Sequence, residues 1–175
     1  MSLGRAYLDD VLFTFRKQKS AADKALAQID DATFYRTPGE HSNSIAAIVK
    51  HVGGNLTSRF TDFLTADGEK PWRDRDAEFV IRPDDSRAKL LEGWERGWNA
   101  LISSLQELRD DDLARTVRIR GEAHTVLQAI NRSLAHTSYH VGQIVYLARL
   151  MTNADWTWIT IPPGGSRTHK KPYLM

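Results

Sequence analysis

The sequence predicts an all-α fold, a four-helix bundle with a small β-hairpin before the last helix and an extended C-terminal tail. Three observations favour this fold class. Apolar residues recur at helical spacing in four long stretches. A short segment before the last stretch alternates around a glycine, as a hairpin does. The residues from 156 onward hold too many prolines and glycines for another helix. A chain of 175 residues has the size of one domain, which we expect to span residues 1–175.

Apolar stripes define the first two helices. The first is expected from Leu3 to about Asp30, and the second over about 44–65. Ser44 offers an N-cap oxygen to the second helix, and Ala66-Asp67-Gly68 is a stop signal after it. The stripes consist of Leu8, Val11, Leu12, Phe15, Ala22, Leu26 and Ile29 in the first helix, and Ile45, Ile48, Val52, Leu56, Phe60 and Phe63 in the second.

A long connection precedes the third helix. Residues 69–83 carry charges of both signs, show no clear period and end at a proline. The third helix is expected to begin after Asp84 or Asp85 as its N-cap. Its apolar residues repeat close to helical spacing and are Leu91, Trp94, Trp98, Leu101, Leu105 and Leu108.

The hairpin is expected over residues 116–124, around Gly121. Thr125 and Gln128 fit the Thr-x-x-Gln capping box, so we expect the fourth helix to begin there and to end near Met151. The tail beyond it should be extended, with its tryptophans packed on the helices.

The composition excludes several functional classes. Lys and Arg number 24 against 22 Asp and Glu, and they are spread along the chain, so no nucleic-acid-binding footprint is expected. Without cysteine there is no disulfide framework, thiolate nucleophile or cysteine-based zinc site. The N-terminus lacks an apolar signal core, and no apolar run is long enough to cross a membrane, so we expect a cytoplasmic protein without a membrane partner.

Three histidines are the candidate metal ligands. His136 and His140 are four residues apart on the fourth helix and therefore share a face. His51 lies at the border of the core face of the second helix. Three neutral imidazoles from two helices would leave a coordination position open on a divalent ion, as catalytic sites do. The alternative is that the histidines bond to one another, or to a core carboxylate such as Glu95.

Several neighbours could support this site. Asn55 and Gln143 could orient ligands or bind substrate, or be ordinary interior polar residues. Arg132, one turn before His136, could present a cation to an anionic group, whereas Arg59 is better explained as a partly solvated salt-bridge partner. Tyr139 points away from both motif histidines and is expected to be a packing residue. No residue is assigned as catalytic. The remaining histidines are expected at the surface: His41, His124 and His169.

At these residues the chain resembles the DinB/YfiT-like superfamily of small bacterial four-helix metalloproteins, in one of its uncharacterised branches. The likeness is carried by Ser44–His51 with Asn55-Leu56, Asp67–Phe79, Ala129–His136 and Tyr139–Ile144. The resemblance implies an up-down-down-up order of helices, a histidine triad that binds a divalent ion such as zinc or nickel, and a homodimer. The Glu69–Phe79 segment is expected to line the site or a dimer face.

The resemblance also implies possible reactions. Characterised relatives include thiol-dependent S-transferases and a mycothiol-dependent maleylpyruvate isomerase. We therefore expect a metal-dependent enzyme that acts on a small-molecule substrate, with S-transfer from a low-molecular-weight thiol as the first hypothesis. A metal-dependent hydrolase is the second, although the sequence offers no convincing general base. The third is a non-enzymatic dimeric stress or binding protein with structural histidines.

Overall fold

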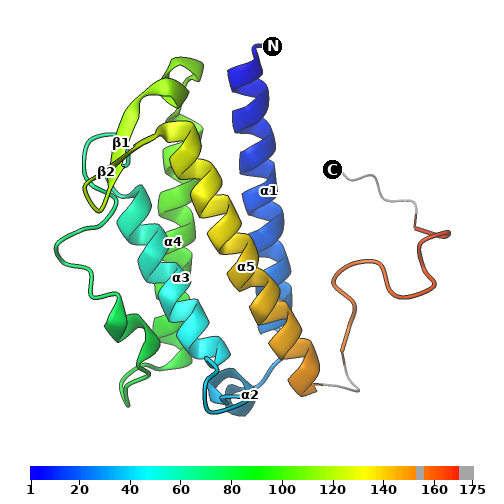
Figure 1. The fold of residues 1–175 in the computed structure, drawn as a ribbon. Helices are drawn as coiled ribbons and strands as arrows, with labels where there is room; N and C mark the ends of the chain where they lie inside the picture. The colour runs from blue at the N-terminus through cyan, green and yellow to red at the C-terminus, as the bar shows by residue number, and fades with distance from the viewer. Residues whose placement is uncertain (153–155, 170–175) are drawn as a thin grey trace.

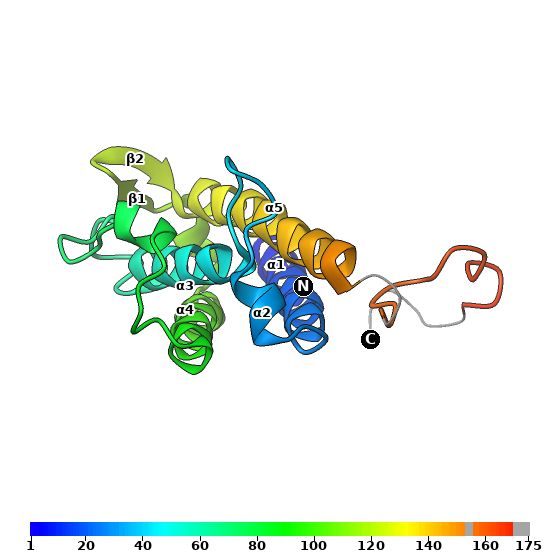
Figure 2. The same cartoon turned by 90° about the horizontal axis from the view of Figure 1, so that it is seen from below.

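The structure is a computed structural model, and it describes residues 1–152 and 156–169. The chain is mostly helical, with long helices α1 (Leu3–Leu26), α3 (Ile45–Phe60), α4 (Arg87–Glu107) and α5 (Val126–Thr152) and a short helix α2 (Asp31–Tyr35). A small antiparallel hairpin, β1 (Thr116–Ile119) and β2 (Glu122–Thr125), precedes α5. Two 3-10 turns, η1 (Asp76–Phe79) and η2 (Asp110–Ala114), lie in connections. Figure 1 shows the four long helices side by side, and Figure 2 shows α3 with α4 beside α1 with α5.

Side-chain caps fix where the helices begin. Ser44 accepts a hydrogen bond from the backbone N–H of Ala47, and Thr125 and Gln128 form the predicted reciprocal capping box. The predicted cap of α4 was wrong. Ser86 caps it, while the carboxylate of Asp85 instead accepts from Lys50 and from the backbone of Arg82.

The first two long helices end earlier than predicted. α1 stops at Leu26 rather than near Asp30, because Asp30 accepts a hydrogen bond from the N–H of Thr33 and so caps the unpredicted α2. α3 stops at Phe60 rather than near residue 65. Asp62 has φ of 50°, a left-handed conformation that Asp tolerates but that ends an α-helix.

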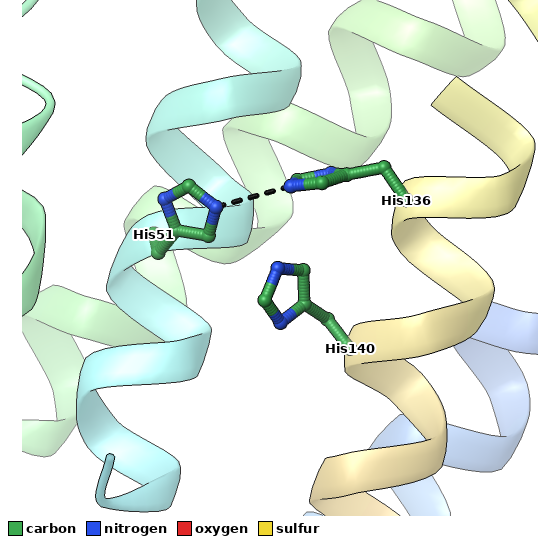
Figure 3. A group of neighbouring side chains, drawn as sticks. All are labelled: His51, His136 and His140. Carbon is green, nitrogen blue, oxygen red and sulfur yellow. Dashed lines mark hydrogen bonds between the residues drawn. The ribbon is translucent and has the colours of Figure 1, made fainter. Parts of the chain in front are cut away.

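Two glycines bring α3 and α4 into close contact. A Cβ on Gly97 of α4 would lie 2.6 Å from the carbonyl oxygen of Gly53 on α3, so the two backbones touch where any side chain would separate them. Trp94 and Trp98 of α4 are fully buried beside this contact. This contact fixes which face of α3 packs against α4. His51 then lies on the side of α3 that faces α5 (Figure 3).

The predicted hairpin is confirmed and is tied to the long connection. Arg120 and Gly121, with φ of 57° and 76°, form its turn, as two-residue hairpins favour. Asp67 accepts hydrogen bonds from the backbone N–H groups of both, at 2.8 and 2.7 Å. The N–H of Gly68 donates to the carbonyl of Arg118. These bonds hold the connection against the hairpin, near the ends of α3 and α5 (Figure 1).

The described part of the tail contains no helix or strand, as predicted. Trp156 and Ile159 pack on the core, and the guanidinium of Arg149 lies 4.0 Å from the ring centre of Trp158. The rest of the predicted tail, 153–155 and 170–175, lies outside the described residues. Among the helices that the structure describes, none is long and apolar enough to span a membrane.

Candidate metal centre

The structure brings the three predicted histidines together from two helices. His51 comes from α3, and His136 and His140 come from successive turns of α5 (Figure 3). Nε2 of His51 lies 3.1 Å from Nε2 of His136, and one ligand-capable atom from each of the three residues lies within 4.8 Å of the others. His51 and His140 are buried, and His136 is half-buried.

A carboxylate fixes the proton position of His51. Oε2 of Glu78, in η1, lies 2.8 Å from Nδ1 of His51. Arg73 holds Glu78 through two hydrogen bonds of 2.8 and 2.9 Å. An ionised carboxylate can only accept a hydrogen bond, so Nδ1 of His51 carries the proton. In a neutral ring the lone pair is then on Nε2, which faces His136. Phe79 stacks on the same imidazole, with ring centres 4.5 Å apart.

Glu78 is ionised despite its burial. Burial alone would raise the pKa of this carboxyl group, but hydrogen bonds from Arg73 and His51 bring its pKa below the usual value. Gly54 makes room for it, because a Cβ at that position would overlap the Glu78 carboxylate. The chain therefore places a paired carboxylate directly behind a candidate ligand.

An amide fixes the ring of His140 in the same way. Oε1 of Gln143 lies 2.8 Å from Nδ1 of His140, one helical turn away. With Nδ1 as the donor, Nε2 of His140 keeps its lone pair. Gln143 is therefore positioned to orient the His140 ring.

Burial favours neutral rings at the other two positions. It lowers the pKa of His136 to about 3 and also lowers the pKa of His140. A neutral imidazole with a free lone pair is the form that binds a metal ion. Nδ1 of His136 is buried and has no hydrogen-bond partner within the described residues.

The arrangement fits a divalent ion. Two nitrogens bound about 2.0–2.1 Å from one ion, at about 90–109° to each other, are about 2.8–3.4 Å apart. The 3.1 Å between His51 and His136 falls within this interval. Two of the three candidate ligands, His51 and His140, also have a carboxylate or amide behind them, a support common to metal-binding histidines.

A cavity of about 180 Å³ adjoins the triad. His51 and His136 form part of its wall, together with the predicted residues Asn55 and Arg132. Asn55 is buried and Arg132 is exposed. Arg59 also lines the cavity and, as predicted, pairs with a carboxylate, that of Glu69, although its side chain is only 9% exposed.

Two neighbouring residues differ from what the sequence suggested. The alternative of histidines bonded to one another and to a carboxylate is met by the His51–His136 hydrogen bond and by Glu78, whereas Glu95, its example, pairs at the surface with Lys19. Tyr139 is 65% exposed rather than packed in the core. It lies on the outer side of α5, although its ring still contacts that of His140.

The site also contains residues that helical periodicity did not identify. Arg73, Glu78 and Phe79 come from the Glu69–Phe79 segment, which the resemblance predicted to line the site or a dimer face. In the structure, this segment lines the site. Within a charge-rich stretch without a period, no local signal marks which carboxylate will be buried.

Comparisons with known proteins agree with this architecture. Residues 2–165 match the family model DUF1572, a protein family of unknown function. A search of curated proteins finds no match. Among solved structures, the chain is similar to a DinB-like protein, YjoA, from Bacillus subtilis, with 16% sequence identity and a TM-score of 0.57 over 85% of this chain and 96% of that one. The chain therefore belongs to the DUF1572 family of proteins of unknown function. Its fold is similar to that of a DinB-like protein, in agreement with the resemblance seen in the sequence.

Proposed function

We propose that this protein is a divalent-metal-dependent enzyme that acts on a small-molecule substrate, with His51, His136 and His140 as the metal ligands. One observation carries the proposal. Three half-buried or buried imidazoles converge beside a cavity, and the Nδ1 atoms of two of them are held by Glu78 and Gln143. Imidazole ligands suit zinc and nickel, and three of them leave room for a further ligand.

The chain's own residues would prepare the site in two ways. Glu78 and Gln143 hold protons at Nδ1 of their histidines, so both Nε2 atoms are available. Phe79 covers one face of the His51 ring and keeps water from it. When bound, a divalent ion supplies a Lewis acid that lowers the pKa of a thiol or water at the open position.

S-transfer from a low-molecular-weight thiol is the reaction we favour. The S–H bond of the thiol breaks and its sulfur forms a bond to an electrophilic carbon of the substrate. The bond from that carbon to a leaving group breaks, the leaving group departs with the electron pair, and the thiol proton passes to solvent or to the leaving group. The resemblance of the sequence to the DinB/YfiT-like superfamily, and the similar fold of a DinB-like protein, support this choice. Hydrolysis would need a free general base, and Glu78, whose carboxylate contacts the triad in the part of the chain that the structure describes, is already engaged by Arg73 and His51.

Metal content tests the proposal. Elemental analysis of untagged protein, purified without chelator or added metal, should find about one zinc, nickel or similar ion per chain. The His136→Ala/His140→Ala variant should contain none, since loss of two ligands removes most of the affinity. An absence of metal in both proteins, with no uptake on titration, would refute the proposal.

Activity distinguishes the reactions. A screen that combines thiols with electrophilic substrates should show turnover that disappears in His51→Ala. Persistent thiol conjugation after complete metal removal would contradict S-transfer at this site. Metal-dependent turnover of esters, amides or phosphates alone would instead assign a hydrolase.

We also infer that the long helices form a four-helix bundle within a single domain. Figure 1 supports an up-down-down-up order, since α1 and α5 run in one direction and α3 and α4 in the other. Limited proteolysis tests the domain organisation. A single protected core that retains the three histidines is expected.

A further inference from the structure

Arginine dominates the wall of the cavity beside the triad. Five arginines line it, from four separate parts of the chain: Arg59, Arg73, Arg75, Arg120 and Arg132. They reach it from α3, from the connection, from the hairpin turn and from α5. Such convergence in space is invisible in the composition, where basic and acidic residues nearly balance at 24 and 22.

The carboxylates near the cavity only partly neutralise these cations. A single oxygen of Glu69, Oε2, accepts from Arg59 at 3.0 Å, Arg73 at 3.3 Å and Arg120 at 3.2 Å. One negative charge therefore serves three guanidinium groups there. The second carboxylate, Glu78, is shared between Arg73 and His51. The wall keeps an excess of positive charge.

Arg132 differs from the other cavity arginines in its hydrogen-bond partner. In the part of the chain that the structure describes, it has no carboxylate partner, and its guanidinium lies 3.2 Å from Nε2 of His124. Nδ1 of His124 lies 3.1 Å from the backbone carbonyl oxygen of Glu122. Because a carbonyl oxygen can only accept a hydrogen bond, Nδ1 carries the proton and Nε2 accepts from Arg132. The exposed carboxylate of Glu122 lies 4.0 Å from the same Nε2 and forms no ion pair with Arg132, so the charge of Arg132 is at most weakly compensated.

Arg132 lies close to the candidate metal centre. It precedes His136 by four residues on α5, so the two side chains share a face, with Cβ atoms about 5–6 Å apart. Arg75 also lines the cavity and is exposed. Its ion pair with Asp76 is long, at 3.5 Å, and solvated. A ligand in the cavity would meet both guanidinium donors and two of the three histidines, His51 and His136.

We propose that the cavity is the subsite for an oxyanion group, a carboxylate or a phosphate, of the small-molecule substrate or thiol, with Arg132 as its principal contact. Guanidinium binds both groups through paired, charge-assisted hydrogen bonds. The acid group would be held about one helical turn from the ligand His136, which places the reacting part of the molecule over the triad. This inference rests on the proposed function, since it specifies the substrate class of the same site.

Anion binding tests the inference apart from activity. Isothermal titration calorimetry at low ionic strength would use inorganic phosphate in one series and succinate in another. We expect saturable binding of one anion per chain, weakened about tenfold or more in Arg132→Gln. The series that binds more tightly identifies the acid group as phosphate or carboxylate.

Two controls separate the anion subsite from other effects. Arg149→Gln removes the same charge from the same helix but outside the cavity, and should leave binding unchanged. His136→Ala/His140→Ala, with folding checked by circular dichroism, should still bind the anion. The inference is overturned if neither acid binds saturably to the wild-type protein. It is also overturned if Arg149→Gln weakens binding as much as Arg132→Gln does. Loss of binding in the double histidine variant, with binding intact in Arg132→Gln, would overturn it as well. Metal analysis of the same samples reports separately on the proposed function.

Discussion

Glu78 lies 2.8 Å from Nδ1 of His51, although 27 positions separate the two residues in the sequence. This contact links the long connection to α3, and Arg73 anchors it from the other side of the carboxylate. The connection is therefore part of the candidate metal centre. A carboxylate behind a ligating imidazole raises the basicity of the ring and fixes its orientation.

Replacement of Glu78 by Gln should weaken metal binding. The amide keeps the size of the side chain but removes the charge that holds the His51 tautomer, so we expect metal affinity to fall about 10–100-fold. Competition with a chromophoric chelator measures the change. Asp76→Asn is the matched control, because Asp76 lies in the same 3-10 turn and its side chain is 96% exposed. Equal affinity in Glu78→Gln and wild type would show that the carboxylate does not support the site.

The contrast between His51 and Glu78 shows what local sequence can predict. His51 was identifiable because it lies beside a helical apolar stripe, where an unpaired imidazole is costly to bury. Glu78 lies in a segment with no period, and its burial depends on the docking of η1 against α3. Likewise, the stop signal at Gly68 was visible, but the left-handed Asp62 that ends α3 earlier was not. Periodicity therefore predicts helices, and tertiary packing decides their ends and their partners.

Close packing of α3 against α4 should tolerate no added methyl group at Gly97. Its Cβ would lie 2.6 Å from the carbonyl oxygen of Gly53, so the helices must move apart. We expect Gly97→Ala to lower the free energy of unfolding by about 1–3 kcal/mol. Chemical denaturation measures the change.

Gly142→Ala provides the control for this prediction. A Cβ there would meet nothing within 4 Å, and Gly142 lies inside α5, so alanine should stabilise the protein by about 0.5–1 kcal/mol. Opposite signs at the two glycines are expected. A neutral Gly97→Ala would mean that the α3–α4 contact is looser than the structure indicates.

The hairpin should loosen at acidic pH through Asp67. Burial would raise the pKa of this carboxyl group, but hydrogen bonds from the backbone N–H groups of Glu69, Gly121 and Arg120 lower its pKa below 3.8. A lowered pKa in the folded state means that the unfolded chain binds the proton first. The stabilisation is therefore complete above the unfolded pKa and is lost as the pH falls through the folded pKa.

Asp67→Ala tests this effect. We expect it to lower the free energy of unfolding at pH 7 by about 1–2 kcal/mol, and the difference from wild type to shrink as the pH falls below 3.8. Denaturation at a series of pH values gives both quantities. Asp111→Ala, at an exposed position, should have little effect at any pH. A difference that stays constant with pH would show that the charge of Asp67 contributes nothing.

Gln143 should matter for metal binding without mattering for folding. It is only partly buried, and its Oε1 lies 2.8 Å from Nδ1 of His140. Gln143→Met keeps the length and the helical preference of the side chain but removes this acceptor, which leaves the His140 ring free to rotate and to change tautomer. We expect metal affinity to fall about tenfold or more, with the melting temperature of the metal-free protein nearly unchanged. Gln106→Met, at an exposed site on α4, should alter neither quantity. If Gln143→Met binds metal as wild type does, the orientation of His140 must come from packing alone.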